Sequence, residues 1–144
     1  MDVNQTWRCM EDVWNIEAQA VSSLSSTIDR DALIAVTELL CNCSGKIVFS
    51  GCGTSGVAAR KAVHMLNCVE APSSFLSPSE ALHGGLGILR QNDVLILLSK
   101  GGQSAEINAF IAPPWFSAAF SIALACAVPI LAPSIPVSVN IAVS

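Results

Sequence analysis

Apolar residues recur at helical spacing near the start of the chain. Residues 6–26 carry apolar side chains mostly three or four positions apart, with acidic residues in the early turns, which predicts an amphipathic helix. A second helical pattern follows, with Asp29 or Asp31 as its N-cap, an apolar stripe over residues 33–40 and Gly45 beyond its end. The pattern therefore predicts two helices before the first strand.

Farther along, short apolar runs predict strands. Residues 46–50 form such a run between two glycines, and helical spacing returns over residues 57–66. A weaker strand is predicted at residues 75–76 and the strongest at 93–98, where the run after Asp93 is continuously apolar, as a strand covered by helices on both faces requires. Repeated strand and helix units predict an α/β fold of three layers, built on a doubly wound parallel sheet.

A glycine-rich loop, Gly51-Cys52-Gly53-Thr54-Ser55-Gly56, joins the first predicted strand to the next helix. Glycines permit a tight turn, and the helix start presents unpaired N–H groups and a positive dipole end, so the loop suits an anion. The loop also matches the dinucleotide pattern G-x-G-x-x-G, but that pattern needs an acidic residue at the end of the second strand. This chain has Leu76-Ser77-Pro78 there, and Glu70 precedes the strand. A phosphate is therefore favoured over a dinucleotide.

A second loop, residues 99–106, follows the strongest predicted strand. Its serines and glycines again suit a phosphate, and Lys100 adds charge. In a sheet of order 2-1-3, the loops after strands 1 and 3 face each other across the crevice where the strand order reverses. One small phosphorylated molecule accounts for both loops, although glycine and serine also serve as ordinary turns and helix caps.

Composition narrows the class of protein. Hydrophobic residues make up 52% of the 144, and the net charge is -4, which excludes a disordered chain and argues against a nucleic-acid binder. No signal peptide is apparent and the six cysteines lack zinc-finger spacing, so we expect a reduced, cytoplasmic chain without a metal. Cys9, Cys41 and Cys68 are expected to be small buried side chains.

Between the two loops, residues 77–87 form an excursion longer than a simple connection needs. It contains His83, whereas the other histidine, His64, falls within a predicted helix and is expected to be structural. With residues 45–56, 78–84 and 93–106, the chain resembles the SIS (sugar isomerase) domain and, within it, the KpsF/GutQ group of arabinose-5-phosphate isomerases.

The resemblance spans about residues 8–111 and implies a flavodoxin-like sheet that binds phosphosugars. The implied chemistry is aldose–ketose isomerisation, in which a base moves a proton between C1 and C2 through an enediol, with no cofactor. It places Glu106 in the active site and matches His83 to the family's histidine; we assign Glu106 as the base and His83 as a proton shuttle. The predicted phosphate-binding residues come from the two loops: Gly53, Thr54, Ser55, Ser99, Gln103 and Ser104.

The loops depart from the family's pattern at two places. Thr54 stands where the arabinose-5-phosphate isomerases have lysine, so a cation is missing there. The family's Ser-x-Ser-Gly loop reads Ser99-Lys100-Gly101-Gly102, which loses one hydroxyl and gains Lys100. The identity of the sugar therefore stays open.

The end of the chain differs from the rest. All 7 basic and 11 acidic residues lie in residues 1–106, and the resemblance stops after Ile111. Residues 116–132 allow a membrane-spanning helix, although Pro129 interrupts it, while 128–131 and 137–143 allow strands. The abrupt loss of charge and glycine favours a third interpretation, in which the tail comes from a shifted reading frame or a premature terminus.

We therefore expect one SIS domain over residues 1–144, comprising N-terminal helices (1–44), a core (45–111) and an atypical uncharged tail (112–144). Three functions remain open: an isomerase, for example of ribulose 5-phosphate to arabinose 5-phosphate; a non-catalytic phosphosugar-binding module, as in regulators; or an inactive truncated remnant. The expected partner is a sugar phosphate, with no nucleic acid and no membrane. Because active sites in this family form at subunit contacts, the resemblance also implies a homo-oligomer, a dimer or tetramer.

Overall fold

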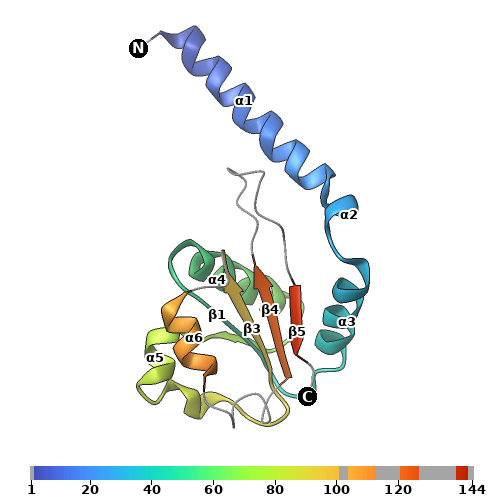
Figure 1. Ribbon diagram of the computed structural model, residues 1–144, viewed down its shortest axis with the longest axis vertical. Coiled ribbons are helices and arrows are strands. Elements are labelled where there is room, and N and C mark those ends of the chain that lie inside the picture. Colours follow the sequence, from blue (N-terminus) through green and yellow to red (C-terminus); the bar gives the residue numbers. More distant parts are fainter. Residues whose placement is uncertain (1, 101–103, 113–120, 127–138, 143–144) are drawn as a thin grey trace.

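The computed structural model describes residues 2–100, 104–112, 121–126 and 139–142 (Figure 1). Its elements in chain order are α1 (Val3–Ser22), α2 (Leu24–Thr27), α3 (Arg30–Cys41), β1 (Ile47–Gly51), α4 (Gly53–Cys68), β2 (Ser73–Phe75), α5 (Pro78–Leu82), the 3-10 helix η1 (Gly85–Ile88), β3 (Val94–Ser99), α6 (Ala105–Ile111), β4 (Ser121–Cys126) and β5 (Val139–Ala142).

The strands form one sheet in the order β2-β1-β3-β4-β5. Strands β1 to β4 run parallel, whereas β5 pairs antiparallel with β4. The register aligns Ile47 with Val94 and Gly51 with Leu98, so β1 and β3 end side by side. The predicted α/β fold and the order 2-1-3 are confirmed, and the antiparallel edge strand is an addition to the expected parallel sheet.

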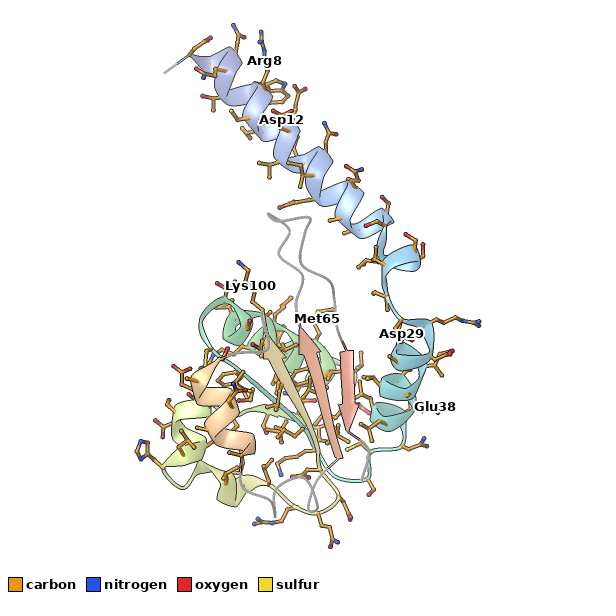
Figure 2. All side chains as sticks on the ribbon, in the orientation of Figure 1. Arg8, Asp12, Asp29, Glu38, Met65 and Lys100 are labelled. Carbon is orange, nitrogen blue, oxygen red and sulfur yellow. The ribbon has the colours of Figure 1, made fainter. Side chains whose placement is uncertain are left out.

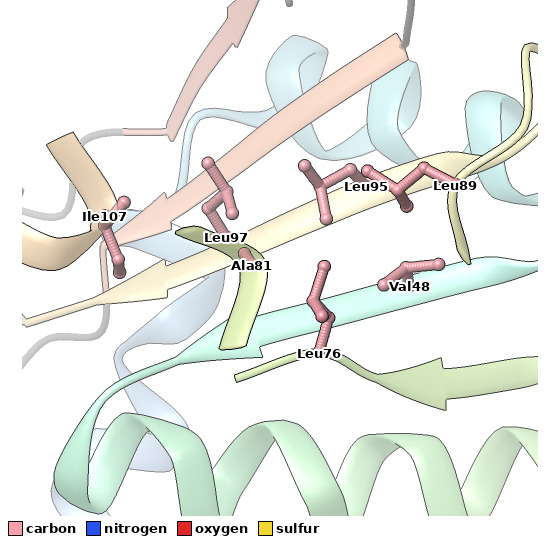
Figure 3. Packing of buried hydrophobic residues seen from close by; sticks show 7 residues of the cluster. All are labelled: Val48, Leu76, Ala81, Leu89, Leu95, Leu97 and Ile107. Atoms are coloured by element: carbon pink, nitrogen blue, oxygen red, sulfur yellow. The ribbon is translucent and has the colours of Figure 1, made fainter. Parts of the chain in front are cut away.

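Alternate residues of β1 and β3 face opposite sides of the sheet and enter two apolar clusters. One cluster joins the strands to α5 and α6 (Figure 3); its buried members are Val48, Leu76, Ala81, Leu89, Leu95, Leu97 and Ile107. The other joins them to α3 and α4; its buried members are Ile47, Phe49, Ala59, Val94 and Ile96. Helices therefore cover both faces of the sheet, which accounts for the continuously apolar β3.

The N-terminal segment forms three helices where two were predicted. The pattern over residues 6–26 corresponds to α1 and α2, which are separated at Ser23. The Asp29 carboxylate accepts hydrogen bonds from the N–H groups of Asp31 and Ala32, both at 3.0 Å, and so caps α3. Of the two predicted N-caps, Asp29 is therefore confirmed and Asp31 is wrong.

Helix α1 extends away from the sheet and has no buried residue (Figure 1). Figure 2 shows Arg8 and Asp12 on this arm. The rings of Trp7 and Trp14 pack edge to face with centroids 5.7 Å apart, yet each residue remains about half exposed, at 54% and 49%. The apolar face of α1 thus gains almost nothing from the rest of the chain.

The cysteines are less buried than expected. Cys9 lies on the exposed arm, and Cys41 and Cys68 lie in the last turns of α3 and α4, where all three are exposed. The expectation of buried side chains was wrong because it assumed that each helix packs along its whole length.

The described part of the tail continues the sheet. A membrane-spanning helix over residues 116–132 is wrong, because residues 121–126 form β4, which pairs with β3 along its whole length. The predicted strand at 137–143 is confirmed by β5, and the one at 128–131 lies outside the described residues. Among the described helices, none is long and apolar enough to cross a membrane.

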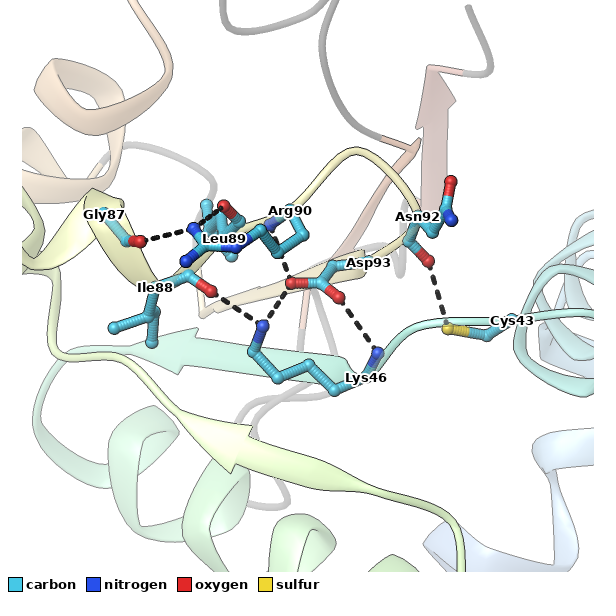
Figure 4. A network of polar contacts seen from close by, with 8 residues as sticks. All are labelled: Cys43, Lys46, Gly87, Ile88, Leu89, Arg90, Asn92 and Asp93. Atoms are coloured by element: carbon cyan, nitrogen blue, oxygen red, sulfur yellow. Dashed lines mark hydrogen bonds and ion pairs between the residues drawn. The ribbon is translucent and has the colours of Figure 1, made fainter.

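A polar network ties the start of β1 to the start of β3 (Figure 4). Asp93 is only 4% exposed, and its carboxylate accepts hydrogen bonds from the backbone N–H of Lys46 at 3.0 Å and of Arg90 at 2.8 Å. The Lys46 ammonium forms an ion pair with the same carboxylate and donates to the carbonyl of Ile88 at 2.7 Å. The network fixes the strand ends opposite those that carry the two loops.

Candidate functional site

A cavity of about 300 Å³ lies at the carboxyl end of β1. It is lined by the β1–α4 loop, the first two turns of α4, the end of β2, the start of α5 and one residue of α6. This volume is at the lower end of the range of about 300–1,000 Å³ for small-molecule sites, so it suits a small ligand. The position also matches the crevice predicted for an open α/β sheet.

The β1–α4 loop is shaped by its glycines. Gly53 has a φ of +53°, which a residue with a side chain rarely adopts. Gly56 lies so close to β1 that a Cβ there would be 2.7 Å from the carbonyl oxygen of Gly51. Helix α4 therefore begins at Gly53, four residues before the predicted start, and the Cys52 side chain makes no capping hydrogen bond to it. The first-turn N–H groups can thus accept an anion.

Glu106 lies in the first turn of α6 and brings a carboxylate to the cavity. Its charge reaches the first loop: burial raises the pKa of the Cys52 thiol, and the negative charge of Glu106 raises it further. The thiol therefore stays protonated at neutral pH, which argues against a nucleophilic thiolate at this site. A carboxylate beside an anion-accepting helix start can take a proton from a bound phosphorylated molecule.

Arg60 and Phe75 also line the cavity, and the sequence reasoning missed both. The guanidinium carbon of Arg60 lies 3.8 Å from the centroid of the Phe75 ring. A signal for Arg60 was present, because positions 53, 56, 57 and 60 have the spacing of one helical face and all line the cavity. Phe75 had no such signal, because its place depends on β2 lying beside α4.

The structure places the predicted site residues unequally. Of the phosphate-binding set, Gly53 lines the cavity, while Thr54 is exposed and Ser55 is half-buried in the first turn of α4. Ser99 is buried and its hydroxyl lies 3.1 Å from that of Ser104, which links the end of β3 to the start of α6. These three serines and Thr54 are not among the described residues that line the cavity, and their roles as phosphate ligands stay predictions.

The two remaining predictions concern Gln103 and His83. Gln103 lies outside the described residues. His83 is the exposed C-cap of α5 and is not among the described lining residues, so its role as a shuttle stays a prediction. As for metals, the described residues include no group of three or more histidine, cysteine, aspartate or glutamate side chains placed to hold an ion.

Comparison with known proteins identifies relatives of this architecture. The SIS domain model matches residues 40–112. Arabinose 5-phosphate isomerase KpsF of Escherichia coli is 38% identical over 91 residues, which cover 63% of this chain and 28% of the relative. The chain therefore spans less than a third of the length of this curated relative.

Solved structures extend the similarity. A Listeria monocytogenes protein provisionally described as a sugar-phosphate isomerase is 40% identical with a TM-score of 0.83, covering 97% of this chain and 76% of that one. An Escherichia coli CFT073 protein solved in complex with arabinose 5-phosphate is 30% identical with a TM-score of 0.76, covering 85% of this chain and 64% of that one.

Proposed function

The chain belongs to the SIS domain family, and on that premise we propose that it binds a sugar phosphate in the cavity at the end of β1 and catalyses its aldose–ketose isomerisation. The pair we propose is ribulose 5-phosphate and arabinose 5-phosphate. One observation carries the proposal: an anion-accepting helix start and the Glu106 carboxylate line the same cavity. The similarity to KpsF and to the protein solved with arabinose 5-phosphate supports the choice of sugar.

In the proposed reaction, the N–H groups at the start of α4 hold the phosphate and so fix the sugar carbons relative to Glu106. The carboxylate takes a proton from C1 of the ketose, which leaves an enediolate. It then returns a proton to C2, which gives the aldose and regenerates the carboxylate. A proton must also move between O1 and O2, and this step is the one we assign to His83.

Glutamate-to-glutamine variants test the base. Glu106→Gln keeps the size and polarity of the side chain but cannot accept the proton, so exchange of solvent protons at C2 should be abolished while arabinose 5-phosphate still binds. The matched control is Glu80→Gln, because Glu80 is an exposed carboxylate in the first turn of α5 and is not among the described lining residues. Unchanged exchange in Glu106→Gln would remove Glu106 from this role.

A second candidate is a non-catalytic phosphosugar-binding module. It is favoured by Thr54, an uncharged residue in the first turn of α4 where the resembled isomerases carry lysine. Calorimetry with ribulose 5-phosphate followed by an isomerase assay separates the candidates. Binding with turnover supports the isomerase, binding without turnover supports the module, and no binding supports an inactive remnant.

We also propose a homo-oligomer, a dimer or tetramer. The exposed apolar face of α1 motivates this, since Trp7, Met10 and Trp14 lie three and four positions apart and each is between 43% and 54% exposed. An isolated helix with such a face is poorly stabilised in water, and a second copy of the chain can cover it. Sedimentation velocity should report a dimer or tetramer, whereas a monomer at all concentrations would contradict the proposal.

A further inference from the structure

We propose that Arg60 binds the charged group of the sugar phosphate and that Phe75 holds the Arg60 guanidinium in position. This inference rests on the proposed function, because it names a binding residue for the same cavity. It concerns a cation that neither the loop motifs nor the carboxylate accounts for.

The first step is the balance of charge in the cavity. Among its described lining residues, Arg60 and Glu106 are the charged ones. A phosphomonoester brings further negative charge beside Glu106, whose field already contributes to the raised pKa of Cys52. Backbone N–H groups carry only partial charges, so a full positive charge is needed to offset two anionic groups in one small space.

The second step is geometry along α4. A helical side chain leans toward the N-terminus and covers the turn before its own Cα. Arg60 therefore leans over Gly56, four residues earlier, where no side chain stands between it and the anion-accepting loop. The missing side chain also makes room for Phe75, because a Cβ on Gly56 would be 3.7 Å from the ring carbon Cζ.

The third step is what the ring does to the guanidinium. A guanidinium near an aromatic ring is attracted through its face, and its five N–H donors remain free in the plane. Within the described part of the chain, no hydrogen bond or ion pair engages the Arg60 side chain, whereas the Lys46 ammonium is fully committed to the network beneath the sheet. Arg60 is thus oriented without using donors, which is what bidentate binding of a phosphate requires.

Calorimetry with arabinose 5-phosphate and with inorganic phosphate tests this inference. Arg60→Gln should weaken binding of both by about 10- to 100-fold, the loss expected for charge-assisted hydrogen bonds. Arg60→Lys should recover part of the loss, since lysine restores the charge but not the fork. Phe75→Leu should weaken binding less than Arg60→Gln, because it only frees the guanidinium. In turnover, Arg60→Gln should raise KM more than it lowers kcat.

The matched control is Lys61→Gln, which removes the neighbouring exposed cation that is not among the described lining residues. It should bind as wild type does, and circular dichroism should show all variants folded. If wild type binds and Arg60→Gln binds equally well, the inference is wrong while the proposed function stands. If wild type binds no sugar phosphate, the proposed function fails and this inference fails with it.

Discussion

Replacing Asp93 by asparagine removes the charge at the centre of the network that joins β1 to β3. The wild-type carboxylate accepts hydrogen bonds from two backbone N–H groups and pairs with the Lys46 ammonium. Asparagine has one acceptor oxygen, so it can keep one of these contacts, and its amide group faces the remaining donors. Asp93→Asn should therefore destabilise the fold.

The magnitude follows from the groups left without an acceptor. Hydrogen bonds to a charged group contribute about 1.5–3 kcal/mol each, and two are lost. The Lys46 side chain is 28% exposed and keeps its bond to the Ile88 carbonyl, so water can partly solvate the ammonium. We expect a loss of about 2–4 kcal/mol in the free energy of unfolding, which lowers the urea midpoint by roughly 1–2 M.

The effect should also depend on pH. Burial alone would raise the pKa of Asp93, but hydrogen bonds from Lys46 and Arg90 and the Lys46 charge outweigh it, so the pKa is lowered. A lowered pKa gives stability that is present above the unfolded value, about pH 4, and is lost as the pH falls through the folded value. The difference between wild type and Asp93→Asn should therefore be largest near pH 7 and shrink below about pH 4.

Urea unfolding followed by circular dichroism at pH 7 and at pH 3 measures both effects. The matched control is Asp12→Asn, because Asp12 is an exposed carboxylate on the α1 arm, and its free energy of unfolding should stay within about 0.5 kcal/mol of wild type. The reasoning is refuted if Asp93→Asn unfolds at the wild-type midpoint at pH 7, or if its deficit persists undiminished at pH 3.

Three further variants follow from burial and close packing. Leu95→Ala empties a fully buried position and should cost about 2–5 kcal/mol by urea unfolding, whereas the same change at Leu33, 51% exposed, should cost far less. Gly56→Ala puts a Cβ against the Gly51 carbonyl, so α4 must shift and calorimetry should show weaker sugar-phosphate binding; wild-type affinity would contradict this close contact. Ser50→Ala removes a buried hydroxyl with no hydrogen-bond partner among the described residues and should leave stability unchanged or raise it by about 1 kcal/mol; a clear loss would mean that the hydroxyl is paired.

Local patterns carried the fold prediction a long way. The strand at residues 93–98 was recognisable because burial on both faces demands an unbroken apolar run, and the structure has it as Val94–Ser99. The α3 cap at Asp29 and the glycine-rich loop were readable because a capping side chain and a positive-φ glycine act within a few residues of themselves. The exposed Cys41 was misjudged because burial depends on what packs against a helix end.

The sequence by itself determined the α/β class, the two glycine loops and the position of Glu106, because each follows from spacing along the chain. Only the tertiary structure decided that Arg60 and Phe75 share a cavity with Glu106, and that Lys46 and Asp93 meet across 47 positions of sequence. The same holds for the tail, where β5 runs antiparallel at the sheet edge. Periodicity records which face of an element is apolar, but partners depend on strand order and register, which the whole packed sheet sets.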